Sequence, residues 1–254
     1  MNLFFDIRLA EDYHSLLQKV RVMSENWVEK NIYCVRCGNN LKRLKNNTPI
    51  SDLYCERCKE NFELKSNKNL FTKKIVDGAY SKMIEKIENG NIPNFFYLNY
   101  SSVDYRVKNL IVIPSHFFTK EIIIKRPPLS VNAKRAGWVG CNIDVSFIPE
   151  SGKLFLIRNE KVEDKNTIIE KFNKMLFLQR STGEFRGWLL DVLKCIELLG
   201  MSDFSLKDIY AFEEILRKKH PKNFNIKAKI RQQLQMLRDF GYLSFTKRGN
   251  YSLR

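Results

Sequence analysis

The chain has 254 residues, 44% of them hydrophobic, which is enough for one large domain or for two domains with their own cores. No stretch approaches 18 uncharged apolar residues and acids occur early, so the sequence excludes a membrane span and a secretory signal and predicts a cytoplasmic, bacterial protein. The formal net charge of +16 favours a polyanionic partner such as nucleic acid, with a basic surface kept for solubility as the alternative.

A helix and four cysteines open the chain. Apolar residues recur every three or four positions over residues 10–30, which predicts an amphipathic helix. The spacing C-x2-C-x17-C-x2-C then predicts a structural zinc site; two disulfides are the alternative, which a reducing cytosol disfavours. Cys141 and Cys195 lie outside the pattern and are expected to be buried apolar side chains. The four cysteines of the pattern are Cys34, Cys37, Cys55 and Cys58.

Three charged residues flank the second cysteine pair. If the segments around Asp52 and Glu63 form a hairpin, Glu63 and Lys65 share one face of their strand, because side chains alternate. Two carboxylates and the Leu64 carbonyl suit Mg2+, and Lys65 can orient or deprotonate a water or stabilise charge on a phosphorane. We therefore predict catalytic roles for Asp52, Glu63 and Lys65 and a Mg2+ site at Asp52, Glu63 and Leu64. The string is weak alone, and an ordinary exposed hairpin is the alternative.

The next elements predict a mixed sheet with flanking helices, an α/β or α+β core. A helix is expected over 74–89, ended by Gly90 and Pro93, and another lies within 159–180. Buried strands are expected at 94–100, 109–114 and 153–158.

The segment from Lys125 to Ile143 breaks this pattern. It has two prolines, two glycines, four basic residues and no acid, which predicts a long irregular loop against a phosphate backbone. Lys134 and Arg135 are its candidate DNA contacts. Trp138 either stacks on or wedges against a base, or tucks into the core of the protein.

The last part of the chain predicts a winged helix. Helices are expected at 187–200, at 204–220 with Ser205 as the N-cap and Asp208 three residues on, and at 223–241, followed by a hairpin around a turn at 247–250. The third helix has an apolar stripe of Ile226, Ile230, Leu234 and Leu237, and its other faces carry Lys227, Lys229, Arg231, Gln232, Gln233 and Gln235. We predict DNA contacts there and in the hairpin, with a solvated helix face as the alternative. The contacts chosen are Lys227, Arg231, Gln232, Gln235 and Arg248.

Several strings of residues carry a resemblance. PISDLYC and FELKS resemble the PD-(D/E)xK nuclease signature, although Pro49 stands three residues before Asp52 instead of directly before it. Longer strings are similar to the DpnI-like methyl-directed type IIM restriction endonucleases over essentially the full chain. They are WVEKNIYCVRCGNN (27–40), DGAY (77–80), NIPNFFYLNY (91–100), AKRAGWVGCNID (133–144), RGW (186–188) and KIRQQLQMLRD (229–239).

The resemblance implies a monomer with a PD-(D/E)xK catalytic domain at 1–180, bearing a four-cysteine zinc site, and a winged-helix DNA-binding domain at 181–254. It also implies Mg2+-dependent cleavage of double-stranded DNA at GATC sites that carry N6-methyladenine. By resemblance, Asp52, Glu63 and Lys65 take the catalytic positions, the four cysteines the zinc positions, and Trp138 the methyladenine-sensing position. The alternative is a methyl-DNA-binding regulator with an inactive nuclease core.

Overall fold

The computed structural model describes residues 1–44, 51–69, 73–181 and 183–254. The chain divides into two compact units. The first comprises Met1–Phe147 and Ser151–Leu176, and the second comprises Ile148–Glu150 and Phe177–Arg254. Pro49, part of the resemblance to the nuclease signature, lies outside the described residues. No described helix has the length and apolar character needed to cross a membrane.

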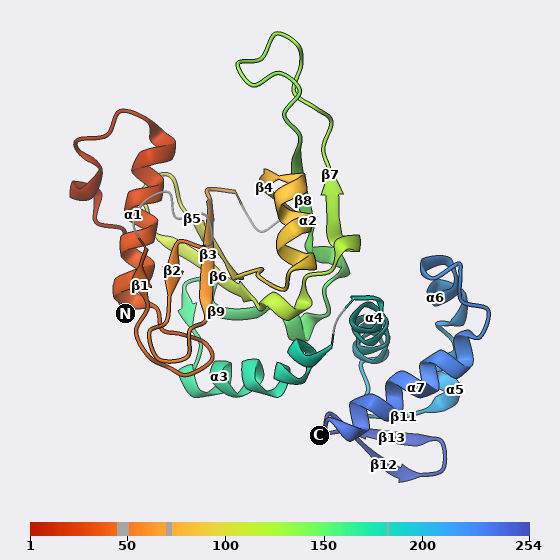
Figure 1. Ribbon diagram of the computed structural model, residues 1–254. Coiled ribbons are helices and arrows are strands. Elements are labelled where there is room, and N and C mark those ends of the chain that lie inside the picture. The colour runs from red at the N-terminus through yellow and green to blue at the C-terminus, as the bar shows by residue number, and fades with distance from the viewer. Residues whose placement is uncertain (45–50, 70–72, 182) are drawn as a thin grey trace. The chain divides into compact units, whose positions relative to one another are not determined.

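A seven-stranded sheet organises the first unit (Figure 1). Its strands β3 and β5 are parallel, and every other neighbouring pair in it is antiparallel. All seven residues of β5 are buried, as expected for a strand that is covered on both faces. In spatial order the strands are β1 (Lys42–Arg43), β2 (Leu53–Tyr54), β3 (Asn61–Asn67), β5 (Asn94–Tyr100), β6 (Val107–Ile113), β9 (Leu154–Arg158) and β10 (Lys161–Val162).

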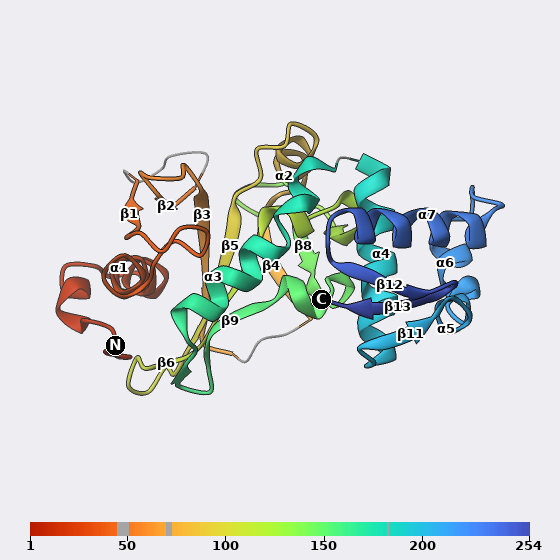
Figure 2. The same ribbon diagram turned by 90° about the horizontal axis from the view of Figure 1, so that it is seen from below.

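One face of this sheet packs against two helices, α1 (Leu16–Asn31) and α3 (Lys165–Lys174), the second of which crosses beneath the sheet (Figure 2). Phe62 of β3 and Phe96 of β5 stack there with ring centroids 4.9 Å apart. Trp27 of α1 and Phe172 of α3 belong to the same buried cluster. Because strand side chains alternate, the residues next to Phe62 and Leu64 in β3, including Glu63 and Lys65, point to the opposite face.

A smaller sheet lies on that opposite side. It consists of β4 (Lys74–Ala79), β8 (Gly140–Asp144) and β7 (Ile123–Lys125), in the order β4-β8-β7, and α2 (Tyr80–Glu88) packs against all three strands. Short 3-10 helices complete this part of the chain: η1 (Ile7–Ala10), η2 (Ser115–Phe117), η3 (Lys120–Ile122), η4 (Val145–Phe147) and η5 (Glu150–Gly152).

The strands predicted at 94–100, 109–114 and 153–158 are confirmed as β5, β6 and β9, but three predictions for this unit were wrong in part. The first half of the helix expected over 74–89 is strand β4, because pairing with β8 outweighs the helical spacing of Ile75 and Ala79. The segment 125–143 is irregular only over 126–139, since Gly140 to Ile143 lie in β8. The helix expected from residue 10 begins at Leu16, after η1 and an extended Ser15.

The second unit is a helix-turn-helix unit with a three-stranded sheet, the arrangement of a winged helix. Its sheet order is β11-β13-β12. The predicted hairpin is confirmed as β12 and β13, with Gly249 at φ 73° in the turn. The elements are η6 (Leu176–Arg180), α4 (Gly183–Leu199), β11 (Asp203–Ser205), α5 (Leu206–Tyr210), α6 (Glu213–Lys219), α7 (Ile226–Asp239), β12 (Leu243–Lys247) and β13 (Asn250–Leu253).

Short-range sequence patterns account for most of the helices and turns of this unit. Ser205 and Asp208 form the expected capping box, in which each side chain accepts a hydrogen bond from the other residue's backbone N–H. The single helix expected at 204–220 is instead two, because the chain makes a tighter 3-10-type turn at Ala211 and Phe212. The four stripe residues of α7 are all buried, as predicted. The expected α/β (α+β) sheet core followed by a helix-turn-helix unit is thus confirmed.

Candidate metal centre and active site

Four thiols converge where α1 ends and the β2–β3 hairpin turns. Cys34 Sγ lies 3.4 Å from Cys58 Sγ, and Cys37 Sγ lies 3.4 Å from Cys55 Sγ. All four sulfur atoms lie within 4.8 Å of one another, and all four cysteines are free thiols. Burial raises the pKa of Cys34 and that of Cys58, the latter to about 11. A cation would compensate the buried thiolate charge, so this donor set fits a tetrahedral zinc ion.

The two cysteine pairs sit in equivalent turns. In the first, the backbone N–H of Gly38 donates to the Cys34 carbonyl at 2.8 Å; in the second, that of Lys59 donates to the Cys55 carbonyl at 2.9 Å. Both residues have a positive φ, 76° for Gly38 and 63° for Lys59. Such turns direct two sulfur atoms to one point within each short segment, which is why the cysteine spacing alone predicts the cluster.

Ion pairs and hydrogen bonds connect the turns to the rest of the first unit. The Glu60 carboxylate accepts from Arg36 at 2.7 Å and from the Asn94 side chain of β5 at 2.8 Å. Lys165 of α3 donates to the Gly38 carbonyl at 2.8 Å. Because β5 pairs directly with β3, the thiol cluster and the strand that bears Glu63 and Lys65 are fixed to the same framework.

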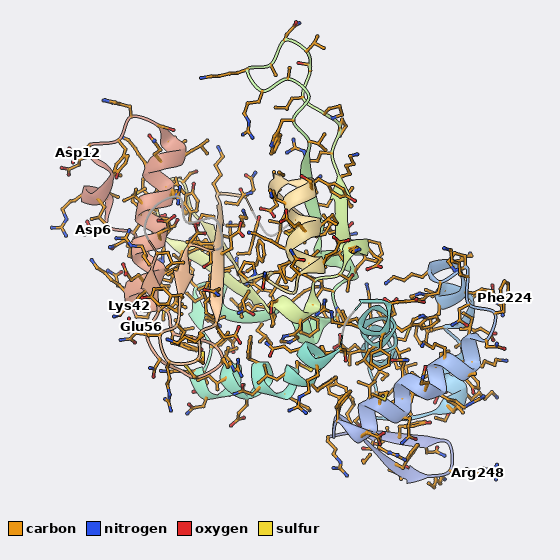
Figure 3. The ribbon with its side chains drawn as sticks, viewed as in Figure 1. Asp6, Asp12, Lys42, Glu56, Phe224 and Arg248 are labelled. Atoms are coloured by element: carbon orange, nitrogen blue, oxygen red, sulfur yellow. The ribbon has the colours of Figure 1, made fainter. Side chains whose placement is uncertain are left out.

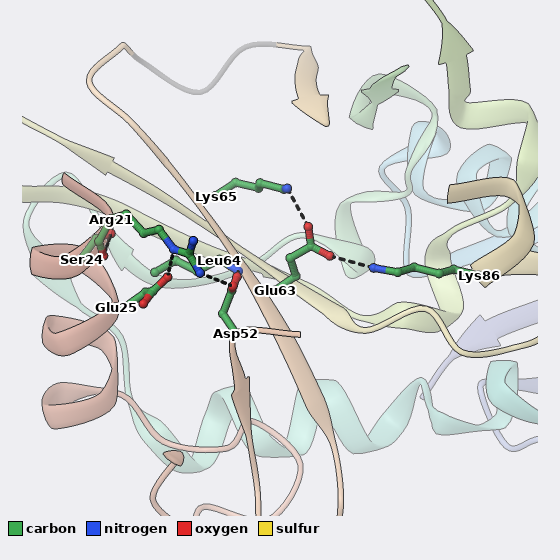
Figure 4. A network of polar contacts seen from close by, with 8 residues as sticks. All are labelled: Arg21, Ser24, Glu25, Asp52, Glu63, Leu64, Lys65 and Lys86. Atoms are coloured by element: carbon green, nitrogen blue, oxygen red, sulfur yellow. Dashed lines mark hydrogen bonds and ion pairs between the residues drawn. The ribbon is translucent and has the colours of Figure 1, made fainter. Parts of the chain in front are cut away.

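Asp52 lies at the edge of β3, immediately before β2. Its backbone N–H donates to the Phe62 carbonyl at 3.0 Å, and its carboxylate accepts from the Leu64 N–H at 2.8 Å. The N–H and C=O of one strand residue face the same neighbouring strand. The Leu64 carbonyl therefore points to the same edge as the Asp52 carboxylate, and Arg21 of α1 lies 3.8 Å from that carboxylate (Figure 4).

Glu63 and Lys65 form an ion pair on the face of β3 away from Phe62. The Lys65 Nζ lies 2.6 Å from Glu63 Oε1 and 2.5 Å from Asp77 Oδ1 of β4. The other oxygen of Glu63 lies 3.4 Å from the Lys86 Nζ of α2 (Figure 4). The expected hairpin therefore brings Glu63 and Lys65 into contact and sets the Asp52 carboxylate against the same strand.

The surroundings set the charges of this group. Burial raises the pKa of Asp52, and the nearby Glu63 carboxylate raises it further. Burial opposes the charge on Lys65, but the carboxylates of Glu63 and Asp77 outweigh it and raise the pKa of Lys65. A lysine held charged in this way is suited to stabilise negative charge and not to accept a proton.

The oxygen atoms of this group fit a hard divalent cation. Asp52 and Glu63 supply carboxylates and Leu64 supplies a carbonyl, which are the ligand types that Mg2+ accepts while it keeps several waters. The mutual repulsion of the Asp52 and Glu63 carboxylates is one cause of the raised pKa of Asp52, and a cation between them would relieve it.

Asp77 and Lys86 are charged residues of this group that the sequence patterns did not indicate. Asp77 was assigned to a helix, and a helical position gives no reason to pair it with Lys65. In the observed strand, Ile75 and Asp77 share a face, with Ile75 only 2% exposed and the Asp77 side chain 7% exposed. The signal available in the sequence was the period-two spacing of Ile75 and Asp77, which suits one face of a strand.

The loop of residues 126–139 extends from β7 and β8 (Figure 1). Lys134 and Arg135 are exposed, as expected for candidate DNA contacts. Trp138 is half-buried: its ring covers Gly140, where an added Cβ would come within 2.8 Å of it, and the Arg135 guanidinium lies 4.6 Å from the ring centroid. Trp138 thus neither enters the core nor stands free in solvent.

The residues of the second unit that are predicted to contact DNA differ in their exposure and in their neighbours. Lys227, Arg231, Gln232 and Arg248 are exposed and Gln235 is half-buried. Arg248 lies in the turn between β12 and β13 (Figure 3). Neighbours already engage three of these residues: Lys227 pairs with Glu213 at 3.3 Å, Arg231 donates to the Tyr210 hydroxyl at 2.8 Å, and Gln235 donates to Asp239 at 3.0 Å.

The placement of Gln233 on an outer face of α7 was wrong, because this side chain is fully buried. It follows Ile230 by three residues, which puts it on the side of the apolar stripe. Cys141 and Cys195 are buried, as expected, and burial raises their pKa to about 11 and about 12.

The fold indicates a class of DNA-binding protein. It has an α/β core with a four-thiol cluster, followed in the chain by a helix-turn-helix unit of the kind that binds DNA. Two family models match this chain, that of the Dam-replacing family over residues 1–181 and that of the Dam-replacing HTH domain over residues 184–253. The chain belongs to the Dam-replacing family. This membership agrees with the resemblance to DpnI-like methyl-directed restriction enzymes and indicates a DNA-binding restriction nuclease.

Proposed function

We propose that the protein is a methylation-dependent restriction endonuclease that cleaves double-stranded DNA at GATC sites carrying N6-methyladenine, by Mg2+-dependent phosphodiester hydrolysis. The observation that carries the proposal is the contact of Glu63 with Lys65, beside the Asp52 carboxylate, in a chain of the Dam-replacing family. We assign catalysis to residues 1–180 and DNA binding to residues 181–254, and we propose that the enzyme acts as a monomer.

Asp52, Glu63 and the Leu64 carbonyl are the proposed Mg2+ ligands. The ion, when bound, activates a water and stabilises negative charge on the phosphate. The protein's own contribution is the ammonium of Lys65, which is held charged beside the ligands and can stabilise the charge that develops on the phosphorus. Zinc at Cys34, Cys37, Cys55 and Cys58 has a structural role, because a site closed by four thiolates leaves no open position for substrate.

Methyl recognition is assigned to Trp138, with help from the basic residues around it and from the second unit. An added methyl group is apolar, and the exposed part of an aromatic ring can contact it. Burial of one methyl supplies about 1 kcal/mol, so strong discrimination requires more than one contact. The proposed DNA contacts are Lys134 and Arg135 in the loop, and Lys227, Arg231, Gln232, Gln235 and Arg248 in the second unit.

Plasmid digestion tests the proposal. One plasmid is prepared from a host that methylates adenine in GATC and from a host that does not, and each preparation is incubated with the purified protein in Mg2+ or in chelator. We expect cutting of the methylated plasmid in Mg2+ only. Equal cutting of both preparations refutes the methyl dependence, and no cutting of either refutes the nuclease function in favour of a DNA-binding regulator with an inactive core.

A further inference from the structure

Lys65 has two carboxylate partners that differ in their other duties. Glu63 lies 2.6 Å from Lys65 and is shared with Lys86, and the proposed function requires the same carboxylate to bind Mg2+. Asp77 lies 2.5 Å from Lys65 and is not among the proposed metal ligands. The Asp77 side chain is also the more buried of the two, 7% exposed against 17% for Glu63.

The strand that carries Asp77 aims it at Lys65. Asp77 pairs with Cys141 across β4 and β8, and the register shifts between Asp77 and Ala79, which marks a β-bulge. A bulge redirects side chains and is common beside active sites. The Cys141 thiol donates to the Gly78 carbonyl at 3.5 Å within this irregular stretch.

The pairing joins two sheets. Lys65 belongs to the seven-stranded sheet and Asp77 to the sheet β4-β8-β7, so the ion pair links elements that are not hydrogen-bonded to each other as strands. The Lys65 ammonium lies 5.9 Å from the Phe95 ring centroid, and apolar surroundings of this kind strengthen an ion pair and penalise a lone charge. A partly buried ammonium that lost both carboxylates would therefore not hold its position.

We infer that Asp77 is a positioning residue of the proposed active site, which keeps the Lys65 ammonium in place when Glu63 turns to the metal. This rests on the proposed function. Glu63 alternates between Lys65 and the metal, whereas Asp77 pairs with Lys65 in both states. Lys86, which contacts Glu63 at 3.4 Å, is released in the metal-bound state.

The test compares Asp77→Asn with Asp144→Asn. Asp144 is a matched control, since it is a buried aspartate in the same sheet, pairs across it with Lys74, and accepts from the Ser146 backbone and hydroxyl instead of from Lys65. Asp77→Glu keeps the charge and serves as the second variant. Thermal unfolding of all three establishes that the proteins compared are folded.

The first readout needs neither metal nor DNA. The metal-free proteins are treated with an amine-acylating reagent, and the modification rate of each lysine is followed by mass spectrometry, with the exposed Lys82 as the internal standard. We expect Asp77→Asn to raise the rate at Lys65 several-fold, because the ammonium then has one carboxylate partner in place of two and is exposed to the reagent more often. Asp144→Asn and Asp77→Glu should leave the rate nearly unchanged. An unchanged rate at Lys65 in Asp77→Asn overturns the inference.

The second readout is single-turnover cleavage of methylated GATC DNA, with DNA affinity measured separately in Ca2+. We expect Asp77→Asn to slow cleavage about 10- to 100-fold at unchanged DNA affinity, because misplacement of a group by about 1 Å has costs of this size. Asp77→Glu should recover part of the rate, and Asp144→Asn should cleave like the unmodified protein. Equal cleavage by Asp77→Asn overturns the inference. If the unmodified protein cuts nothing, the proposed function fails, while the acylation rates separately decide whether Asp77 holds Lys65.

Discussion

The thiol cluster and the charged cluster of the first unit are built in different ways. The four sulfur atoms come from two short turns with the same backbone hydrogen bonds, so each turn places its own pair. The charged cluster draws Asp52, Glu63 and Lys65 from one hairpin but completes it with Asp77 of the smaller sheet and Lys86 of a helix. Local spacing can thus specify a cluster of four thiols, whereas the charges of the proposed active site depend on strands that are distant in the sequence.

The largest expected effect comes from disrupting the thiol cluster. Cys58→Ser, or removal of zinc by a strong chelator, should unfold the turns and abolish DNA cleavage together, because structural zinc sites contribute on the order of 10 kcal/mol to folding in small zinc domains. Thermal unfolding and elemental analysis of bound zinc provide the measurement. Cys195→Ala is the matched control, since that buried cysteine lies outside the cluster and its replacement should leave the zinc content intact. Full thermal stability of the zinc-free protein would contradict a structural role.

Disrupting the charged cluster should lower the cleavage rate far more than it lowers the stability of the fold. Lys65→Ala is expected to lower the cleavage rate about 10²- to 10³-fold, the usual effect of removing one preorganised group that stabilises transition-state charge. DNA affinity, measured by fluorescence anisotropy, should stay within about twofold, because many phosphate contacts share the binding.

Lys82→Ala removes an exposed lysine of α2 that pairs only with Glu85 among the interactions described, and it controls for the loss of one positive charge. Unchanged cleavage by Lys65→Ala would remove the lysine from the proposed mechanism. A protein that binds methylated DNA equally well with and without Lys65, and cuts in neither case, would be the regulator.

A smaller effect is expected at the loop of residues 126–139. Trp138→Ala should reduce the preference for methylated over unmethylated sites about tenfold, the equivalent of burying one to two methyl groups. Cleavage rates on the two plasmid preparations give this ratio. Trp138→Phe keeps an aromatic surface on Gly140 and should retain most of the preference; an unchanged ratio in Trp138→Ala would place methyl recognition elsewhere.

The smallest effect concerns the buried Gln233. Its side-chain oxygen is buried and has no hydrogen-bond partner among the described residues, and its amide nitrogen makes one long contact, 3.4 Å, with Gln232. Gln233→Leu should stabilise the second unit by about 1 kcal/mol, because it removes a buried polar atom at nearly constant volume. Thermal unfolding and DNA binding check this. A destabilised protein would show that the oxygen is hydrogen-bonded in solution. Gln179→Leu, at an exposed position of the same unit, is the control.

The sequence predicted the features that depend on residues close together in the chain. It missed the features that depend on pairing between strands far apart in the chain. The cysteine spacing, the Ser205–Asp208 capping box and the β12–β13 turn each depend on residues close in the chain, and the structure contains all three. Strand β4 was missed because its partner β8 lies more than sixty residues away, and apolar residues spaced at three and four also suit a helix. That one error concealed Asp77, since only the strand assignment turns its side chain toward Lys65.

The two cysteine turns also differ in how freely their sequences can change. Position 38 favours glycine for two reasons, because φ is positive and a Cβ would come within 3.2 Å of the Ile169 and Lys165 side chains. Position 59 has the same backbone, but its lysine is exposed, so an unbranched side chain there meets chiefly the conformational cost of about 1 to 2 kcal/mol. The first turn is constrained by what packs over it, while the second can vary. A tag or fluorescent label attached at position 59 would therefore sit beside the thiol cluster without displacing a packed neighbour.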